Sequence, residues 1–212
     1  MLKQQGNEIS ISAQEPPSLR GGWGWPWSRP DLEVNYEISV PRRFDLRLKT
    51  AGGGIKVAAV QGGVNVRTEG GRLDFDEVEG NVEGQTQGGG IRAAGCKGEL
   101  VVKTAGGGIS VETFTGPFVQ GKSMGGSITA DFAASPKADC VLSTMGGSVT
   151  ARVPATAAVT LEAHTQGGTV KSDLPVMAEG AAKESTLRGK INGGGPLLKL
   201  ETMGGSIHLL KR

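Results

Sequence analysis

The sequence predicts an all-β protein, a parallel β-solenoid of about eight to nine coils of 18–21 residues each. Three observations support this fold class. A glycine-rich motif recurs along the chain, apolar and polar residues alternate with period two between its copies, and no segment shows a competing helical period. The motif is clearest in KTAGGGI, which occurs at Lys49–Ile55 and again at Lys103–Ile109.

Each copy of the motif begins with a threonine or serine, which returns at intervals of 18 to 21 residues and once more near the end. These residues are Thr50, Thr68, Thr86, Thr104, Ser123, Thr144, Thr165 and Thr202. Glycines follow two and three residues later, an aliphatic residue follows after five, and an apolar residue precedes by four. Self-similarity at a period near 20 is typical of a solenoid, so we interpret the glycines as coil corners.

The segments between corners have the pattern of half-buried strands. Val64-Asn65-Val66-Arg67 is an example, with every second residue apolar. A second, weaker corner begins ten residues after each threonine and contains Gly62, Gly80, Gly98 or Gly116. Each coil therefore has two strands and two corners. Coils stacked in parallel about 4.8 Å apart would pair each backbone group with the coils above and below.

Residues 1–45 are organised differently, and we expect N-terminal strands and a Trp/Pro-rich loop that cap the stack. Ile9 and Ile11 alternate with polar residues in one short strand, and residues 32–40 alternate in another. The loop between them carries Trp23, Trp25 and Trp27. It is either an aromatic contact loop for sugars, lipid headgroups or a protein, or a lid over the first coil. The repeats occupy residues 46–210, with an irregular loop expected at about 172–190.

Composition narrows the functional classes. Aromatic residues make up only 4% of the chain, so the core must consist of Ile, Val, Leu and Ala. A net charge of +2 favours neither a nucleic acid nor an acidic partner.

Cys96 and Cys140 occupy apolar columns of the repeat, which predicts buried thiols without a disulfide. No stretch is apolar enough to span a membrane, and the first residues contain no signal peptide.

Two patterns that are typical of functional sites overlap the repeat. Gly116–Ser123 fits the phosphate-binding pattern G-x-x-x-x-G-K-[ST], but a second corner and strand follow it where a helix is required. Glu112 and Asp131 fall in one outward column on adjacent coils, near the separation of a retaining glycosidase pair. Solvated surface charge is the alternative explanation of that pair.

The histidines and the glycine corners do not form a metal-binding pattern. His164 and His208 lie in distant coils, and the corners lack the aspartate of calcium-binding glycine repeats. We therefore expect no catalytic, cofactor-binding or metal-binding residues, and no cofactor.

One column suggests a binding surface. The residue before each repeated threonine points outward, and the basic members of this column are Lys49, Arg67, Lys103 and Lys122. Such a stripe could bind a linear polyanion, since its field raises the local concentration of anions. The alternative is a solvated basic face, partly neutralised by Glu69 and Glu83.

The runs Val34–Pro41, Leu46–Thr50 and Gly195–Thr202, together with the Thr-x-Gly-Gly-x-Ile corners, resemble the bacterial adhesin-like family of β-strand repeat proteins. The resemblance covers about Asn7 to Leu210. It implies a right-handed, single-stranded β-helix in exported or envelope-associated proteins, and it brings no catalytic residues.

The function we expect is a non-enzymatic adhesin, or a binding or scaffolding surface, of the bacterial cell envelope. Its partner would be an envelope polyanion, a glycan or a protein, and not a nucleic acid. The alternatives are a scaffold that assembles end to end through unpaired terminal strands, and a carbohydrate-active β-helix enzyme. A cytoplasmic location is the alternative to the envelope.

Overall fold

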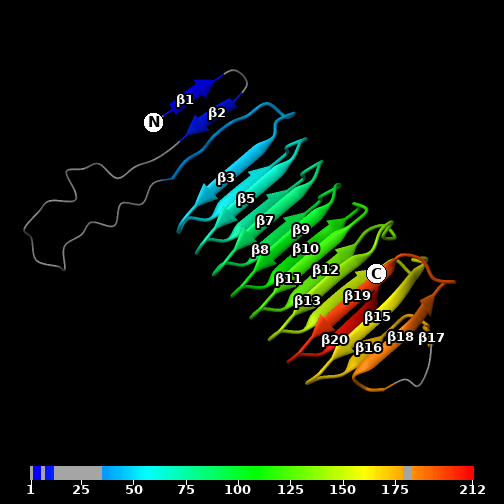
Figure 1. Cartoon of the computed structure of the whole chain (residues 1–212). Coiled ribbons are helices and arrows are strands. Elements are labelled where there is room, and N and C mark those ends of the chain that lie inside the picture. Colours follow the sequence, from blue (N-terminus) through cyan, green and yellow to red (C-terminus); the bar gives the residue numbers. More distant parts are fainter. Residues whose placement is uncertain (1, 6–7, 12–34, 179–182) are drawn as a thin grey trace, which may run out of the picture. The chain divides into compact units, whose positions relative to one another are not determined.

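The computed structural model describes residues 2–5, 8–11, 35–178 and 183–212, and every regular element in them is a β-strand (Figure 1). The chain divides into two units, residues 1–39 and 40–212. In the first unit, β1 (Leu2–Gln5) and β2 (Glu8–Ile11) form an antiparallel pair. The predicted strand at Ile9 and Ile11 is thus confirmed.

The predicted strand over residues 32–40 is wrong for its described part, because residues 35–40 are not in a strand. Of their alternating apolar side chains, Tyr36 is 57% and Ile38 50% exposed, and only Val40 packs against the core. Trp23, Trp25 and Trp27 lie outside the described residues. The cap that we expect residues 1–45 to form stays a prediction.

The second unit is the predicted parallel β-solenoid, in which two open and mainly parallel sheets face each other. The ten-stranded sheet contains, in spatial order, β3 (Leu46–Thr50), β5 (Val64–Thr68), β7 (Val82–Thr86), β9 (Leu100–Thr104), β11 (Val119–Ser123), β13 (Cys140–Thr144), β19 (Leu197–Thr202), β15 (Val159–Thr165), β18 (Thr186–Ile191) and β17 (Met177–Ala178). The eight-stranded sheet contains β4 (Ile55–Ala58), β6 (Leu73–Asp76), β8 (Ile91–Ala94), β10 (Ile109–Phe114), β12 (Ile128–Phe132), β14 (Val149–Val153), β20 (Ile207–Lys211) and β16 (Val170–Ser172).

The core lies between the sheets and follows the predicted alternation. In β5, for example, Val64, Val66 and Thr68 are buried, whereas Asn65 and Arg67 point outward. Cys96 and Cys140 are both buried and free, as their apolar columns predicted. One strand from each sheet makes a coil, and consecutive coils pair residue for residue, such as Leu46 with Val64.

The repeated threonines are buried polar residues with a structural role. The Thr86 hydroxyl donates a hydrogen bond to the Gly71 carbonyl of the preceding coil at 2.9 Å and accepts one from the Gly89 N–H at 3.1 Å. Ser123 repeats this arrangement with Gly107 and Gly126. Because a buried hydroxyl must find partners, the threonine both closes its own corner and ties the corner to its neighbour. The phosphate-loop pattern that ends at Ser123 is therefore one more coil corner.

The order of the coils departs from the order of the sequence. The last coil, formed by β19 and β20, lies between the coil of β13 and β14 and the coil of β15 and β16. It pairs in parallel on both sides, with Cys140 opposite Leu198 and Leu161 opposite Leu198. The threonine contacts follow this spatial order, because Thr202 bonds to Gly147 and Thr165 bonds to Gly205.

The region at 172–190, which we expected to be an irregular loop, ends in ordered structure. β17 lies within it, and β18 begins in it at Thr186. β18 runs antiparallel to β15 along the side opposite β19, and β17 pairs antiparallel with β18. The chain then returns through residues 192–196 to place β19 on the other side of β15. The parallel ladder of this sheet therefore terminates in two antiparallel strands.

Candidate binding surface

The predicted basic stripe is a continuous row on the outer face of the ten-stranded sheet. Strand register pairs its members directly, Lys49 with Arg67 and Lys103 with Lys122, with Gln85 between the two pairs. The row then continues through three further residues, which are Ser143, Glu201 and His164. The basic segment ends after the first five coils, because Ser143 follows Lys122. Glu201 enters the row only because the last coil is inserted.

The row is only partly neutralised within the described residues. Arg67 lies 3.5 Å from Glu83, which also accepts a hydrogen bond from Asn65. Lys49, Lys103 and Lys122 are exposed, and none of them has a carboxylate within ion-pair distance among the described residues. Three cations of the row are therefore available to an external anion.

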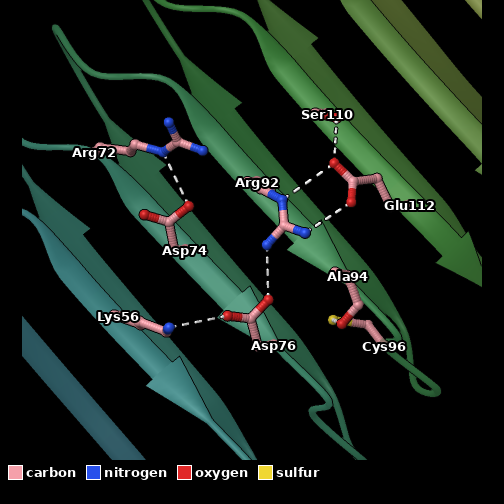
Figure 2. Close-up of polar contacts among 9 residues, drawn as sticks. All are labelled: Lys56, Arg72, Asp74, Asp76, Arg92, Ala94, Cys96, Ser110 and Glu112. Carbon is pink, nitrogen blue, oxygen red and sulfur yellow. Dashed lines mark hydrogen bonds and ion pairs between the residues drawn. The ribbon is translucent and has the colours of Figure 1, made fainter.

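The outer face of the eight-stranded sheet differs over strands β4 to β10, because the charges there pair with one another (Figure 2). Arg92, on β8, contacts Glu112 through two nitrogens at 2.8 and 3.1 Å and contacts Asp76 at 2.8 Å. Asp76 also lies 3.5 Å from Lys56. The hydrogen bond to Glu112 raises the pKa of Arg92, and the same bond lowers the pKa of Glu112. This part of the face holds its ions in an internal network, which leaves less charge there for a ligand.

The candidate carboxylate pair is separated into two ion pairs. Glu112 forms an ion pair with Arg92, whereas Asp131 lies 3.1 Å from Arg212. The Asp131 Oδ1 atom is buried, and its contact with Arg212 does not have hydrogen-bond geometry. An irregularity in the ladder between β10 and β12 lies beside Glu112. A glycosidase acid needs a raised pKa, but the pKa of Glu112 is lowered, so this arrangement does not supply one.

We expect the Arg92–Glu112 contact to stabilise the protein in a pH-dependent way. A carboxyl group whose folded-state pKa lies below its unfolded value of about 4.5 stabilises the fold above that value. The contribution is lost as pH falls through the lowered folded-state pKa. Glu112→Gln should therefore lower the urea midpoint at pH 7, and the difference from wild type should shrink as pH falls below about 4.5 and through the lowered folded-state pKa.

Glu99→Gln provides the matched control, because Glu99 is exposed and has no ion pair among the described residues. Its urea midpoint should stay close to wild type at pH 7 and in acid. A deficit of Glu112→Gln that persists unchanged in acid would contradict the assigned ion pair.

The acidic residues near Asp74 do not form one cluster. Asp74 and Asp76 lie on one face, Glu83 lies on the other, and Glu79 lies at a corner beside Lys97. No group of three or more His, Cys, Asp or Glu residues within the described part of the chain could hold a metal ion. The described residues also include no helix with the length and hydropathy to cross a bilayer.

Comparison with known proteins gives one result. A family described as Toastrack DUF4097 matches residues 1–210. No curated protein and no solved structure is significantly similar to the chain.

Proposed function

The chain belongs to the Toastrack DUF4097 family, and from that premise we propose that it is a non-enzymatic β-solenoid that binds a linear polyanion. The observation that supports this proposal is the row of Lys49, Arg67, Lys103 and Lys122 on a regular ladder. Three of these cations have no carboxylate partner within the described residues. A rigid row of cations about 4.8 Å apart suits a polymer with repeating negative charge better than a compact ligand.

The bacterial cell envelope is the location we propose, in an adhesin or scaffolding role. Teichoic acids, lipopolysaccharide phosphates and acidic glycans are the polyanions of that compartment. The open outer face of a sheet gives lateral access to a long polymer, whereas small substrates are usually held in concave sites. The lowered pKa of Glu112 and its contact with Arg92 weigh against a carbohydrate-active enzyme.

End-to-end assembly of solenoids receives less support from the topology. β18 interrupts the parallel ladder of the ten-stranded sheet, because it pairs antiparallel with both β15 and β17. The edge strand β17 again runs in the direction of the coils, but it has only two residues, so it offers a partner coil a short ladder. Lateral binding through the basic row requires no free edge.

The proposed function predicts salt-sensitive binding that depends on the position of the charges. The probes are inorganic polyphosphate and heparin, titrated against the full chain by fluorescence anisotropy at increasing salt. If four cations each displace counterions from the polymer, the slope of log K against log salt should be about −3, at roughly −0.7 per contact. Replacing Lys49, Arg67, Lys103 and Lys122 together by Gln should weaken binding more than about tenfold and bring the slope close to zero.

The control variant removes the same charge elsewhere. Substituting Gln for four exposed lysines outside the row changes the net charge from +2 to −2 (2 − 4), as the row variant does. These residues are Lys137, Lys171, Lys183 and Lys211. The control should retain most of the binding. Equal losses in the two variants would show a net-charge effect and refute the row, and a wild-type chain that binds neither probe would refute polyanion binding.

A further inference from the structure

Three neighbouring corners of the solenoid carry nearly the same five residues. Ser123–Ser127 reads SMGGS, while Thr144–Ser148 and Thr202–Ser206 both read TMGGS. The methionines of these corners, Met124, Met145 and Met203, are 58%, 49% and 47% exposed. Large apolar side chains that are half exposed on a rigid corner are uncommon in a soluble domain, particularly in a row.

The methionines are neighbours only because of the inserted coil. Met145 and Met203 are 58 residues apart in the sequence, but register pairs Ser123 with Thr144 and Thr144 with Thr202. The corner hydrogen bonds fix the same order, since the Gly146 N–H donates to the Met124 carbonyl at 3.0 Å. The Gly204 N–H donates to the Met145 carbonyl at 2.9 Å. Three thioether side chains thus start from backbones that are held one coil apart.

This spacing allows the three sulfurs to converge. Backbones on adjacent coils are about 4.8 Å apart, so the outer two methionines are separated by roughly 9.6 Å. Methionine is unbranched and has three rotatable bonds, so the outer side chains can bend toward the central one. In the coils on either side, Ala105 and Gln166 take the place of methionine, which restricts the sulfur row to three coils.

We propose that Met124, Met145 and Met203 form a binding site for a soft monovalent metal ion, Cu(I) or Ag(I). Thioether sulfur is a soft, neutral ligand that selects Cu(I) over hard cations such as Mg²⁺ and Ca²⁺. It carries no proton, so it can bind without deprotonation. A docking surface for a protein is the competing explanation, but three half-exposed side chains provide far less than the roughly 800 Å² per partner of a stable interface.

The two cysteine sulfurs are poorly placed to compete, and Met177 is a single thioether outside the row. Cys96 and Cys140 are 1% and 0% exposed. Burial raises the pKa of both thiols, which disfavours the thiolate form that binds metals. Soft-ion binding to the folded chain should therefore report on the methionine row.

The test is titration of the full chain with Ag(I), a redox-inert probe, by isothermal calorimetry and native mass spectrometry. The wild type should bind one ion, with an affinity that changes little between about pH 5 and pH 8, where cysteine and histidine ligands would titrate. The triple variant Met124→Leu, Met145→Leu and Met203→Leu keeps the apolar volume. It should weaken binding more than about tenfold.

Met177→Leu is the matched control, because Met177 is 76% exposed and lies on β17, outside the row. It should bind Ag(I) as the wild type does. Met203→Leu alone should weaken binding as much as Met124→Leu alone, although the two residues are far apart in sequence. Wild-type affinity in the triple variant, no binding by the wild type, or an affinity that rises steeply with pH would each overturn the proposal.

Discussion

Replacing Ile109 by Asp should unfold much of the solenoid and lower the free energy of unfolding by more than about 4 kcal/mol. Ile109 is 3% exposed and lies in β10 between Ile91 of one neighbouring coil and Ile128 of the other. A carboxylate there would be buried without a partner, which is among the most costly changes to a core. Since coils are stabilised by their nearest neighbours, the loss should spread to the coils on both sides.

The adjacent position gives the control. Ser110 points outward, and register places it opposite Arg92. Ser110→Asp therefore puts the new charge beside a cation, although it removes the hydrogen bond that the Ser110 hydroxyl donates to Glu112. Its effect should stay within about 1 kcal/mol. Thermal unfolding followed by circular dichroism distinguishes the two variants. Equal midpoints would mean that the inside-outside phase assigned to β10 is wrong.

The second large effect is expected at the glycine corners. A Cβ on Gly89 would overlap the carbonyl of Gly71 in the preceding coil. The Gly89 N–H also donates to Thr86, so the backbone cannot move away without breaking the corner. Gly89→Ala should therefore force the coils apart and destabilise the protein by about 3 kcal/mol, the upper range for overpacking.

Gly88 allows a comparison one residue away. A Cβ there would lie 3.5 Å from the nearest atom, the Gly70 carbonyl oxygen, which is an ordinary contact. Gly88→Ala should be neutral or stabilise the protein by up to about 1 kcal/mol, because alanine restricts the unfolded chain. Urea unfolding of both variants is the measurement. A Gly89→Ala variant as stable as Gly88→Ala would show that coil spacing does not depend on this glycine.

The repeat predicted most of the fold because each rule behind it is local. In every pair after the first, a Cβ on the second glycine would overlap the backbone of the neighbouring corner, so this glycine recurs with the period of the repeat. Alternation likewise identified Val64, Val66 and Ile109 as core residues. It failed at residues 35–40, which are not in a strand and in which Tyr36 and Ile38 stay exposed while only Val40 packs against the core. Periodicity identifies a potential face, and only a neighbouring layer makes that face buried.

The candidate surfaces were predicted less completely. The basic row was expected from its column, and register confirmed that Lys49, Arg67, Lys103 and Lys122 share one line on one face, although their binding role stays a prediction. The contacts of Arg92 with Asp76 and Glu112 were not foreseen. They join residues from three coils, and the direction of a long side chain is not encoded in its column.

By itself, the sequence determined the coil: its two strands, its glycine corners, its buried threonine and the phase of its faces. The order of the coils was decided only by the tertiary structure. All corners share one geometry, so the coil that contains Thr202 fits between its neighbours as well as the coil that contains Thr165 would. The antiparallel pairing of β18 with β15 occupies one side of β15 and leaves the other for β19. That choice brings Glu201 into the basic row and Met203 beside Met145, because stacking depends on matching neighbours and not on distance along the chain.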